Sequence, residues 1–303
     1  MVGLGISYLL QLTATTTWAF DQASDVESEM TSVERIMSYS HLPPELGYEN
    51  DVTPPRNWPG RGTVDYVNVS FSYYKNGPEV LKDISFSIND SERVGIVGRT
   101  GAGKSSLVAS LLRMPDCQGD IFVDGVSINT VNIQKSRAAI ALIPQDPFLF
   151  NGTLRMNIDP SGSFDDGQML KALEQVQLSS ILQERVAPGR PPLDYQITEH
   201  GSNLSVGERQ LVCLARALLQ NKKIIVLDEA TANVDYKTDR IIQSIIRTNL
   251  TNRTLLTIAH RLDTVMDYDR IMVVDGGRLV EFDTPLALLQ NKNGHFSKMY
   301  KAF

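Results

Sequence analysis

The sequence predicts an α/β fold in which a parallel sheet with crossover helices is joined to an antiparallel β portion and preceded by an N-terminal helix. From residue 139 onward, short apolar runs alternate with helical patterns, which is typical of parallel strands joined by helices. Between residues 64 and 123, strand-like segments follow one another, as in an antiparallel sheet. Ahead of both, residues 21–40 carry an amphipathic helical pattern that continues an uncharged stretch.

The order of the expected elements follows the chain. The early strands are expected at residues 64–71, 84–88 and 121–123. The later strands are expected at residues 139–143, 224–227, 254–258 and 270–274, and long helices at 205–219 and 238–250. A further apolar run at residues 94–97 leads directly into a glycine-rich loop.

Composition indicates a globular protein and argues against nucleic acid as a partner. The 303 residues are 42% hydrophobic and 21% charged, which suffices for a sizeable core. The net charge is -6 and no basic stripe interleaved with aromatics occurs, so binding to a polyanion is not expected. The two cysteines, Cys117 and Cys213, do not suggest a disulfide framework.

The N-terminal region is expected to be the end of a membrane helix and its cytosolic extension, over residues 1–40. Residues 1–20 are uncharged and end in Trp18 and Phe20, where an aromatic belt would lie. A buried soluble helix is the alternative, because the Thr-rich half is only weakly apolar. Five prolines then predict a linker over residues 41–63 and a domain over residues 64–303.

A phosphate-binding loop follows the apolar run at residues 94–97. The pattern is G-x-x-x-x-G-K-S, and its members with the next serine are Gly98, Arg99, Thr100, Gly101, Ala102, Gly103, Lys104, Ser105 and Ser106. We expect the backbone N–H groups to surround phosphate, Lys104 to contact the β and γ phosphates and Ser105 to bind Mg²⁺. The alternative is a glycine-rich turn that opens an ordinary helix, but a strand before and a helix after the loop favour a nucleotide site.

Two carboxylates end the apolar run at residues 224–227. Such a run is typical of a central parallel strand, which would deliver Asp228 and Glu229 to the edge where the phosphates lie. We expect Asp228 to hold Mg²⁺ and Glu229 to act as general base toward the attacking water. The alternative is that the two acids merely begin a turn.

The start of the helix at residues 205–219 has two interpretations. Ser205 and Glu208 have the spacing of a capping box, in which each side chain satisfies the other residue's backbone N–H. The same helix end, with a serine hydroxyl and the bare amide of Gly207, is also suited to an anion. Spacing alone does not choose between them.

The order of these motifs resembles the nucleotide-binding domain of ABC transporters. The phosphate loop, Gln145, residues 204–208, residues 224–229, residues 232–235 and His260 follow one another as in that family. The amino-acid sequences of the motifs resemble those in the second nucleotide-binding domain of the multidrug-resistance-associated (C) subfamily. The resemblance implies a phosphate-loop NTPase core with an antiparallel β subdomain and an α-helical subdomain that carries the signature, here residues 204–208.

The resemblance also implies roles for single residues. Tyr73 matches the aromatic that stacks on adenine, with Tyr74 as an alternate. Gln145 matches the glutamine that approaches Mg²⁺ and the attacking water, and His260 the histidine on the γ-phosphate. Asp235 matches an aspartate that communicates across a dimer. Outside this resemblance, each of these residue types is more often structural.

The signature departs from the family pattern. The family usually has Leu-Ser-Gly-Gly-Gln, whereas Val206 and Glu208 stand here beside Ser205 and Gly207. Glu208 would bring negative charge to a helix end that should meet a triphosphate, so we expect repulsion. Because family domains pair head to tail, this chain's own signature would serve the less active site, while Lys104 and Glu229 complete a competent one.

The function that the resemblance implies is that of an exporter fragment. It would couple hydrolysis of ATP with Mg²⁺ to efflux of organic anions or xenobiotics, from the cytosolic face of the plasma membrane. The implied partners are a first nucleotide-binding domain and the transmembrane domains of the same transporter. Two alternatives remain, a nucleotide sensor of a channel or channel regulator in the same subfamily, and a truncated product without autonomous transport.

Overall fold

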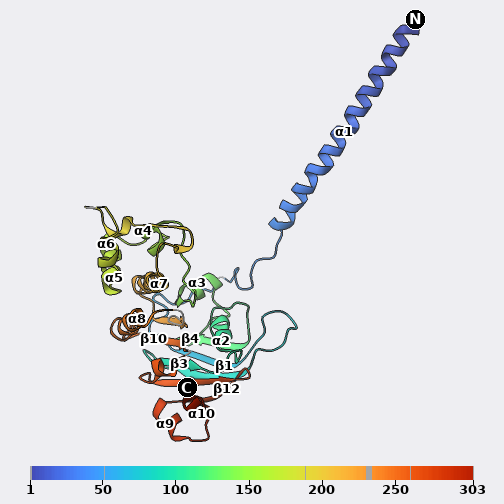
Figure 1. The fold of residues 1–303 in the computed structure, drawn as a ribbon. Helices are drawn as coiled ribbons and strands as arrows, with labels where there is room; N and C mark the ends of the chain where they lie inside the picture. The colour runs from blue at the N-terminus through green and yellow to red at the C-terminus, as the bar shows by residue number, and fades with distance from the viewer. Residues whose placement is uncertain (1, 51, 188, 230–233, 260, 303) are drawn as a thin grey trace. The chain divides into compact units, whose positions relative to one another are not determined.

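The computed structural model describes residues 2–50, 52–187, 189–229, 234–259 and 261–302. The chain divides into two compact units, Met1–Glu45 and Leu46–Phe303 (Figure 1). His260 and residues 230–233, which include Ala232 and Asn233 of the predicted motifs, lie outside the described residues.

The first unit is one long helix, α1 (Val2–Ser40), which joins the uncharged stretch to the amphipathic one. Several threonine hydroxyls donate back to carbonyls one turn earlier, for instance Thr15 Oγ1 to the Gln11 carbonyl at 2.6 Å, and so stay satisfied within the helix. Among the described residues, no helix combines the length and the apolar composition that crossing a membrane requires. The assignment of residues 1–40 to the end of a membrane helix stays a prediction.

The second unit begins with an irregular segment, described at residues 46–50 and 52–63, which we call the strap. Its residues bond to distant parts of the domain: Asn50 Nδ2 donates to the Asn129 carbonyl at 2.9 Å, and Trp58 Nε1 to the Val123 carbonyl at 2.8 Å. At its end, the Asp124 carboxylate accepts the N–H groups of residues 61, 62 and 63. The predicted linker over residues 41–63 is therefore divided between the two units, and most of it is bound to the domain.

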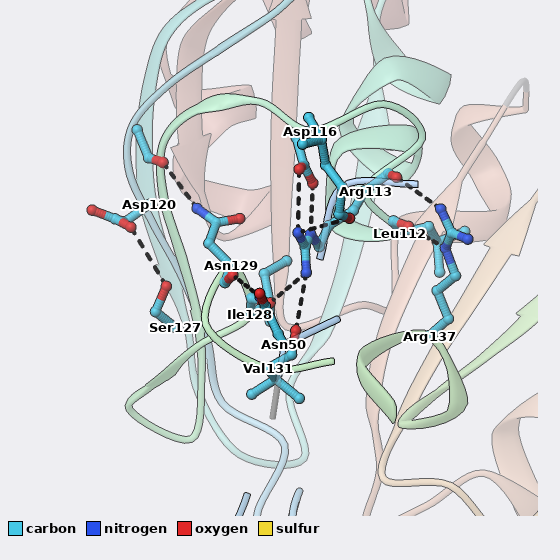
Figure 2. Close-up of polar contacts among 12 residues, drawn as sticks. Asn50, Leu112, Arg113, Asp116, Asp120, Ser127, Ile128, Asn129, Val131 and Arg137 are labelled. Atoms are coloured by element: carbon cyan, nitrogen blue, oxygen red, sulfur yellow. Dashed lines mark hydrogen bonds and ion pairs between the residues drawn. The ribbon is translucent and has the colours of Figure 1, made fainter. Parts of the chain in front are cut away.

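A buried arginine joins the strap to the domain. Arg113 is 3% exposed, and its guanidinium pairs with Asp116 through two hydrogen bonds, at 2.6 and 3.2 Å. Figure 2 shows the same guanidinium donating to the carbonyls of Ile128 and Val131. A further N–H reaches the Leu46 carbonyl in the strap at 3.4 Å. One side chain thus satisfies four partners from three segments of the chain.

Arg113→Ala is expected to lower the free energy of unfolding by about 3 kcal/mol, because the three carbonyls and the carboxylate lose their donor together. This value is at the lower end of the range of about 3 to 5 kcal/mol for breaking a buried ion pair, because the Asp116 side chain is 27% exposed and keeps contact with water. Urea unfolding of the 303-residue chain measures it. Arg61→Ala is the matched control, because only the backbone N–H of Arg61 bonds to Asp124. Equal losses in both variants would show that the Arg113 contacts contribute nothing specific.

The antiparallel sheet confirms the predicted early strands. It contains β1 (Val64–Phe71), β2 (Leu81–Ile88), β4 (Gln118–Val123) and β5 (Val126–Ser127) in the order β2-β1-β4-β5. The inward side chains of β1 are apolar and buried, and they form one hydrophobic cluster with the first helix of the domain core and one face of the second sheet. The antiparallel β portion is thus packed against the parallel sheet.

The parallel sheet has the order β12-β11-β3-β10-β9-β6. Its members are β3 (Arg93–Val97), β6 (Ile140–Ile143), β9 (Ile224–Asp228), β10 (Thr254–Ile258), β11 (Arg270–Asp275) and β12 (Arg278–Asp283), of which only β12 runs antiparallel. Along β9, Ile224 and Val226 belong to the cluster on the antiparallel-sheet side, and Ile225 and Leu227 to a second cluster among the helices. An apolar run without alternation is therefore what this doubly covered strand needs.

Helices cover the sheet and form a separate helical portion between β6 and β9. The helices of the domain are α2 (Lys104–Leu111), α3 (Ile133–Ala138), α4 (Leu154–Ile158), α5 (Asp166–Gln175), α6 (Ser179–Gln183), α7 (Val206–Gln220), α8 (Tyr236–Asn249), α9 (Pro285–Gln290) and α10 (His295–Ala302). A two-stranded sheet, β7 (Gly152–Thr153) with β8 (Gln196–Ile197), lies in the same portion as α4, α5 and α6. Two of these helices, α4 and α5, pack against α7, which also contacts β6 of the parallel sheet, and α6 packs against α5 (Figure 1). The predicted helical subdomain is therefore present.

Candidate functional site

The glycine-rich loop joins the carboxyl end of β3 to the first residue of α2. Gly103 is the residue before the helix and has φ of 108°, which a side chain rarely tolerates. The helix therefore starts at Lys104, and its N-terminal N–H groups face the loop. The strand, loop and helix form the context that the phosphate-loop motif requires.

Lys104 lies inside this loop. Its side chain is 6% exposed, and Nζ donates to the carbonyls of Gly98 at 2.9 Å and Arg99 at 3.2 Å. Burial lowers the pKa of the Lys104 ammonium, while the negative charges of Glu229 and Asp228 act in the opposite direction. The loop thus holds a cation in place at the start of α2, with the two carboxylates after β9 near enough to affect its ionisation.

A pocket of about 310 Å³ brings residues from four parts of the chain together. It is lined by Tyr73, Val80, Thr100, Gly101, Gly103, Lys104, Ser105, Ser106 and Glu229. Tyr73 Oη and Ser106 Oγ are 2.9 Å apart, and the ring of Tyr73 packs edge-on against Phe71 with centroids 5.0 Å apart. An aromatic side chain, the glycine-rich loop and a carboxylate therefore line one pocket, and the roles assigned to them from the sequence stay predictions.

The carboxylates stand at the end of β9, between β6 and β10. Asp228 is the last residue of β9 and lies opposite Ile258 of β10. Glu229 follows with φ of 50°, and its N–H donates to the Ile258 carbonyl at 3.2 Å. This bond to the neighbouring strand fixes the backbone turn that carries Glu229 to the pocket.

A larger cavity of about 500 Å³ lies on another side of the same loop, between Gly98, Arg99, Thr100 and the C-terminal helix α10. Its lining contains neither Lys104 nor Glu229. Of these two described pockets, the smaller one brings together Lys104, Glu229 and an aromatic side chain.

Gln145 does not line the described pocket. Its side chain is exposed, whereas its carbonyl accepts a hydrogen bond from Gln210 Nε2 on α7 at 2.9 Å. The same Nε2 donates to the Pro144 carbonyl at 3.1 Å. The segment that carries Gln145 is therefore tied to the helix that begins at the signature, and its role toward Mg²⁺ stays a prediction.

The capping box at the start of α7 is present. Ser205 Oγ accepts the Glu208 N–H at 3.2 Å, and Glu208 Oε2 accepts the Ser205 N–H at 2.8 Å. The serine hydroxyl accepts in this box, so its own hydrogen can still be donated to an anion. The capping interpretation is confirmed, and it is compatible with the anion interpretation.

Glu208 has a counter-charge that the sequence interpretation did not foresee. Arg185, in the loop after α6, donates to both carboxylate oxygens of Glu208, at 2.6 and 3.2 Å. Burial alone would raise the pKa of Glu208, but the hydrogen bonds from Arg185 and from the Ser205 amide outweigh it and hold the pKa below its ordinary value. The repulsion of a triphosphate that we expected from the sequence requires an unpaired negative charge at this helix end. The charge of Glu208 is instead paired with that of Arg185.

Gly207 is in close contact with α8. A Cβ at this position would lie 2.5 Å from Thr238 Cγ2 and 3.0 Å from Thr238 Cβ. The backbone N–H of Thr238 is held in turn by Asp235, the N-cap of α8, whose carboxylate accepts it at 3.0 Å. This bond lowers the pKa of Asp235. The signature and the predicted dimer-facing aspartate are thus joined through Thr238.

Gly207→Ala is expected to lower the free energy of unfolding by about 2 kcal/mol, because the added methyl group overlaps Thr238 and forces α7 and α8 apart. Urea unfolding of the whole chain measures the loss. In the double variant Gly207→Ala with Thr238→Ser, the Thr238 Cγ2 methyl group at 2.5 Å is gone while Cβ and Oγ stay at 3.0 and 3.2 Å, so part of the loss should return. A double variant as unstable as Gly207→Ala would place the cause elsewhere.

Sequence reasoning missed three residues of this region. Val80 lines the pocket from a loop without periodic pattern, and Gln210 is one buried polar residue in an otherwise apolar helix face. Arg185 lies 23 positions before its partner Glu208. The unusual glutamate itself was the only signal for Arg185, since a partly buried carboxylate needs a donor.

Sequence and structure comparisons both find ABC transporter proteins. A family model described as ABC transporter matches residues 81–232. ATP-binding cassette sub-family C member 4 of Mus musculus is 47% identical over 298 residues, which are 98% of this chain and 22% of that protein. Metal resistance protein YCF1 of Saccharomyces cerevisiae is 47% identical over 299 residues, 98% of this chain and 20% of that protein. The chain thus spans about a fifth of the length of these relatives.

Among solved structures, a bacterial Atm1-family ABC exporter with ATP bound has a similar fold. The TM-score is 0.81 at 33% sequence identity, and the match covers 91% of this chain and 47% of that one. The family model covers half of the chain, and it includes the loop, Gln145, the signature, Asp228 and Glu229. The chain therefore belongs to the ABC transporter family, and it is an ABC-type ATPase domain with relatives among the sub-family C members.

Proposed function

We propose that this domain hydrolyses ATP bound with Mg²⁺ in order to drive an ABC exporter, as the second of its two nucleotide-binding domains. The single observation that carries the proposal is the pocket in which Tyr73, the phosphate loop with Lys104, and Glu229 meet. An aromatic face suits adenine, a cation with helix N–H groups suits phosphates, and a carboxylate suits the attacking water.

Hydrolysis then proceeds by attack of water in line with the bond between the β and γ phosphates. Glu229 accepts the proton of the water, and Lys104 offsets the negative charge that develops on the phosphate oxygens. Because Lys104 is buried, its charge is screened less by solvent than that of a surface lysine. His260 is assigned to the γ-phosphate by the family pattern.

The residues near the loop fit Mg²⁺. Ser105 offers a hydroxyl and Asp228 a carboxylate, and such hard oxygen donors are the ones that Mg²⁺ takes in proteins, with phosphates and water completing its shell. When bound, Mg²⁺ neutralises charge on the phosphates. Gln145 is a further proposed ligand.

The complete site is proposed to form between two domains arranged head to tail. Each nucleotide would lie between the phosphate loop of one domain and the signature of the other, and Asp235 would face the partner. The partner is a first nucleotide-binding domain, and transmembrane domains of the same transporter would contact the segment of Gln145. ATP closes the pair and hydrolysis reopens it, since the γ-phosphate is the group that both halves share.

The transported solute is proposed to be an organic anion or xenobiotic, moved across the plasma membrane with this domain on the cytosolic side. The names of relatives support an export function: one is a bile pigment transporter of Saccharomyces cerevisiae, and another a multidrug resistance protein of Caenorhabditis elegans. The residues that would contact such a solute belong to the membrane domains.

The test is steady-state ATPase activity of the 303-residue chain, alone and then mixed with the first nucleotide-binding domain of the same transporter. The whole chain is used because the strap is bound to the domain through Arg113 and Asp124. Activity that rises on mixing supports a composite site. Equal activity without the partner contradicts the assignment of the chain's own signature to a weak site.

A further inference from the structure

An ion pair stands next to the signature at the start of α7. The two N–H groups of Arg185 lie 2.6 Å from Glu208 Oε1 and 3.2 Å from Oε2, which is the two-pronged geometry of a strong arginine–carboxylate pair. The Glu208 side chain is 13% exposed and that of Arg185 is 38% exposed, so solvent screens the glutamate poorly. Arg185 comes from the loop after α6, outside the helix that it contacts.

The position of Glu208 at the start of α7 lets its charge affect both the helix and phosphate binding. Glu208 is held over the first turn of α7 by the capping box, where Oε2 also accepts the Ser205 N–H. A negative charge in the first turn stabilises the helix, because it faces the positive end of the dipole. For the same reason it competes with any phosphate that should bind to that end. An unpaired Glu208 would therefore favour the helix and oppose the nucleotide.

We propose that Arg185 is a positioning residue of the composite site, one that cancels the charge of Glu208 so that Ser205 and the first amides of α7 can receive the γ-phosphate of a nucleotide held by the partner domain. This inference rests on the proposed function. Arg185 does not touch the nucleotide in it. It fixes the carboxylate toward the α6 side of the helix end and leaves the serine hydroxyl as the polar group that meets the phosphate.

A purely structural role makes a different prediction. If the pair only braces α7 against the loop after α6, loss of either partner breaks the brace, so Arg185→Ala with Glu208→Gln is as impaired as Arg185→Ala alone. If Arg185 cancels charge, its removal harms nucleotide-driven association only while Glu208 is present. A double-mutant cycle separates the two cases.

The experiment follows self-association of the 303-residue chain with increasing MgATP by sedimentation velocity. All variants carry Glu229→Gln, which arrests hydrolysis and so keeps ATP bound. In a head-to-tail pair of identical chains, the signature of each copy faces the nucleotide of the other. Arg185→Ala should raise the ATP concentration for half-maximal association about fivefold, the upper range for a partly exposed pair. Arg185→Ala with Glu208→Gln should return it to within about twofold of the parent, because no charge is left to cancel. Arg185→Lys, which keeps the charge, should recover part of the loss.

Arg190→Ala is the matched control. It removes the same charge from an exposed arginine of the same loop, whose backbone carbonyl is the group that contacts Gln183. ATP binding to the dilute monomer, followed with a fluorescent ATP analogue, should be unchanged by Arg185→Ala, since the phosphate loop is untouched.

The outcomes are distinct. If Arg185→Ala with Glu208→Gln needs as much ATP for association as Arg185→Ala alone, the inference is overturned and the proposed composite site is left standing. Absence of ATP-driven self-association in every variant, while the monomers bind ATP, would overturn the inference and leave the proposed pairing with a first nucleotide-binding domain to the mixing experiment.

Discussion

Lys104→Ala is expected to weaken ATP binding about 100-fold or more, the largest loss of affinity for any single change in this domain. The ammonium is the one cation in the described pocket lining, and charge-assisted bonds to two phosphates contribute about 3 kcal/mol or more together, which corresponds to a loss of about 100-fold or more. Burial strengthens this effect, because the Lys104 side chain lies where water screens little. Equilibrium titration with a fluorescent ATP analogue measures the dissociation constant.

Two controls separate lost binding from lost structure. Nζ also donates to the carbonyls of Gly98 and Arg99, so the variant loosens its own loop. Thermal unfolding without nucleotide reports that loss, and Lys171→Ala on the exposed side of α5 removes the same charge far from the loop in sequence. A dissociation constant within about threefold of the parent would remove Lys104 from the phosphate site.

The sequence predicted the architecture because its signals were local. The run at residues 224–227 is apolar on both faces, and it became β9 between two neighbouring strands. The capping box predicted the start of α7 to within one residue. The prolines of residues 41–63 predicted an irregular segment, but they did not indicate that this segment is bound to the domain.

What could not be predicted depends on contacts between distant segments. Arg113 is hydrogen-bonded to Leu46, and Arg185 to Glu208. The residues of each pair are far apart in the sequence, and hydrophobic periodicity does not predict such contacts. The same holds for Gly207, whose tight space comes from Thr238 on another helix. Charge at the signature was therefore judged from one residue alone, and its pairing emerged only from the fold.

Glu229→Gln is expected to lower the turnover number for ATP about 100-fold or more while the dissociation constant for ATP stays within about twofold. Glutamine keeps the length and shape of the side chain and the N–H bond to the Ile258 carbonyl, so the backbone turn at φ of 50° is retained. What it removes is the carboxylate that accepts a proton from water. Loss of turnover with retained binding is the pattern of a group that acts only in the transition state.

Single-turnover hydrolysis, measured on the chain with its partner domain, tests this directly because it excludes product release from the rate. Glu174→Gln on α5 makes the same chemical change at an exposed position and should leave the rate unchanged. Loss of binding together with turnover would assign Glu229 to nucleotide binding through its charge on Lys104, which the pKa of that lysine already reflects. Turnover within about tenfold of the parent would mean that another group accepts the proton, because a lost general base costs at least about two orders of magnitude.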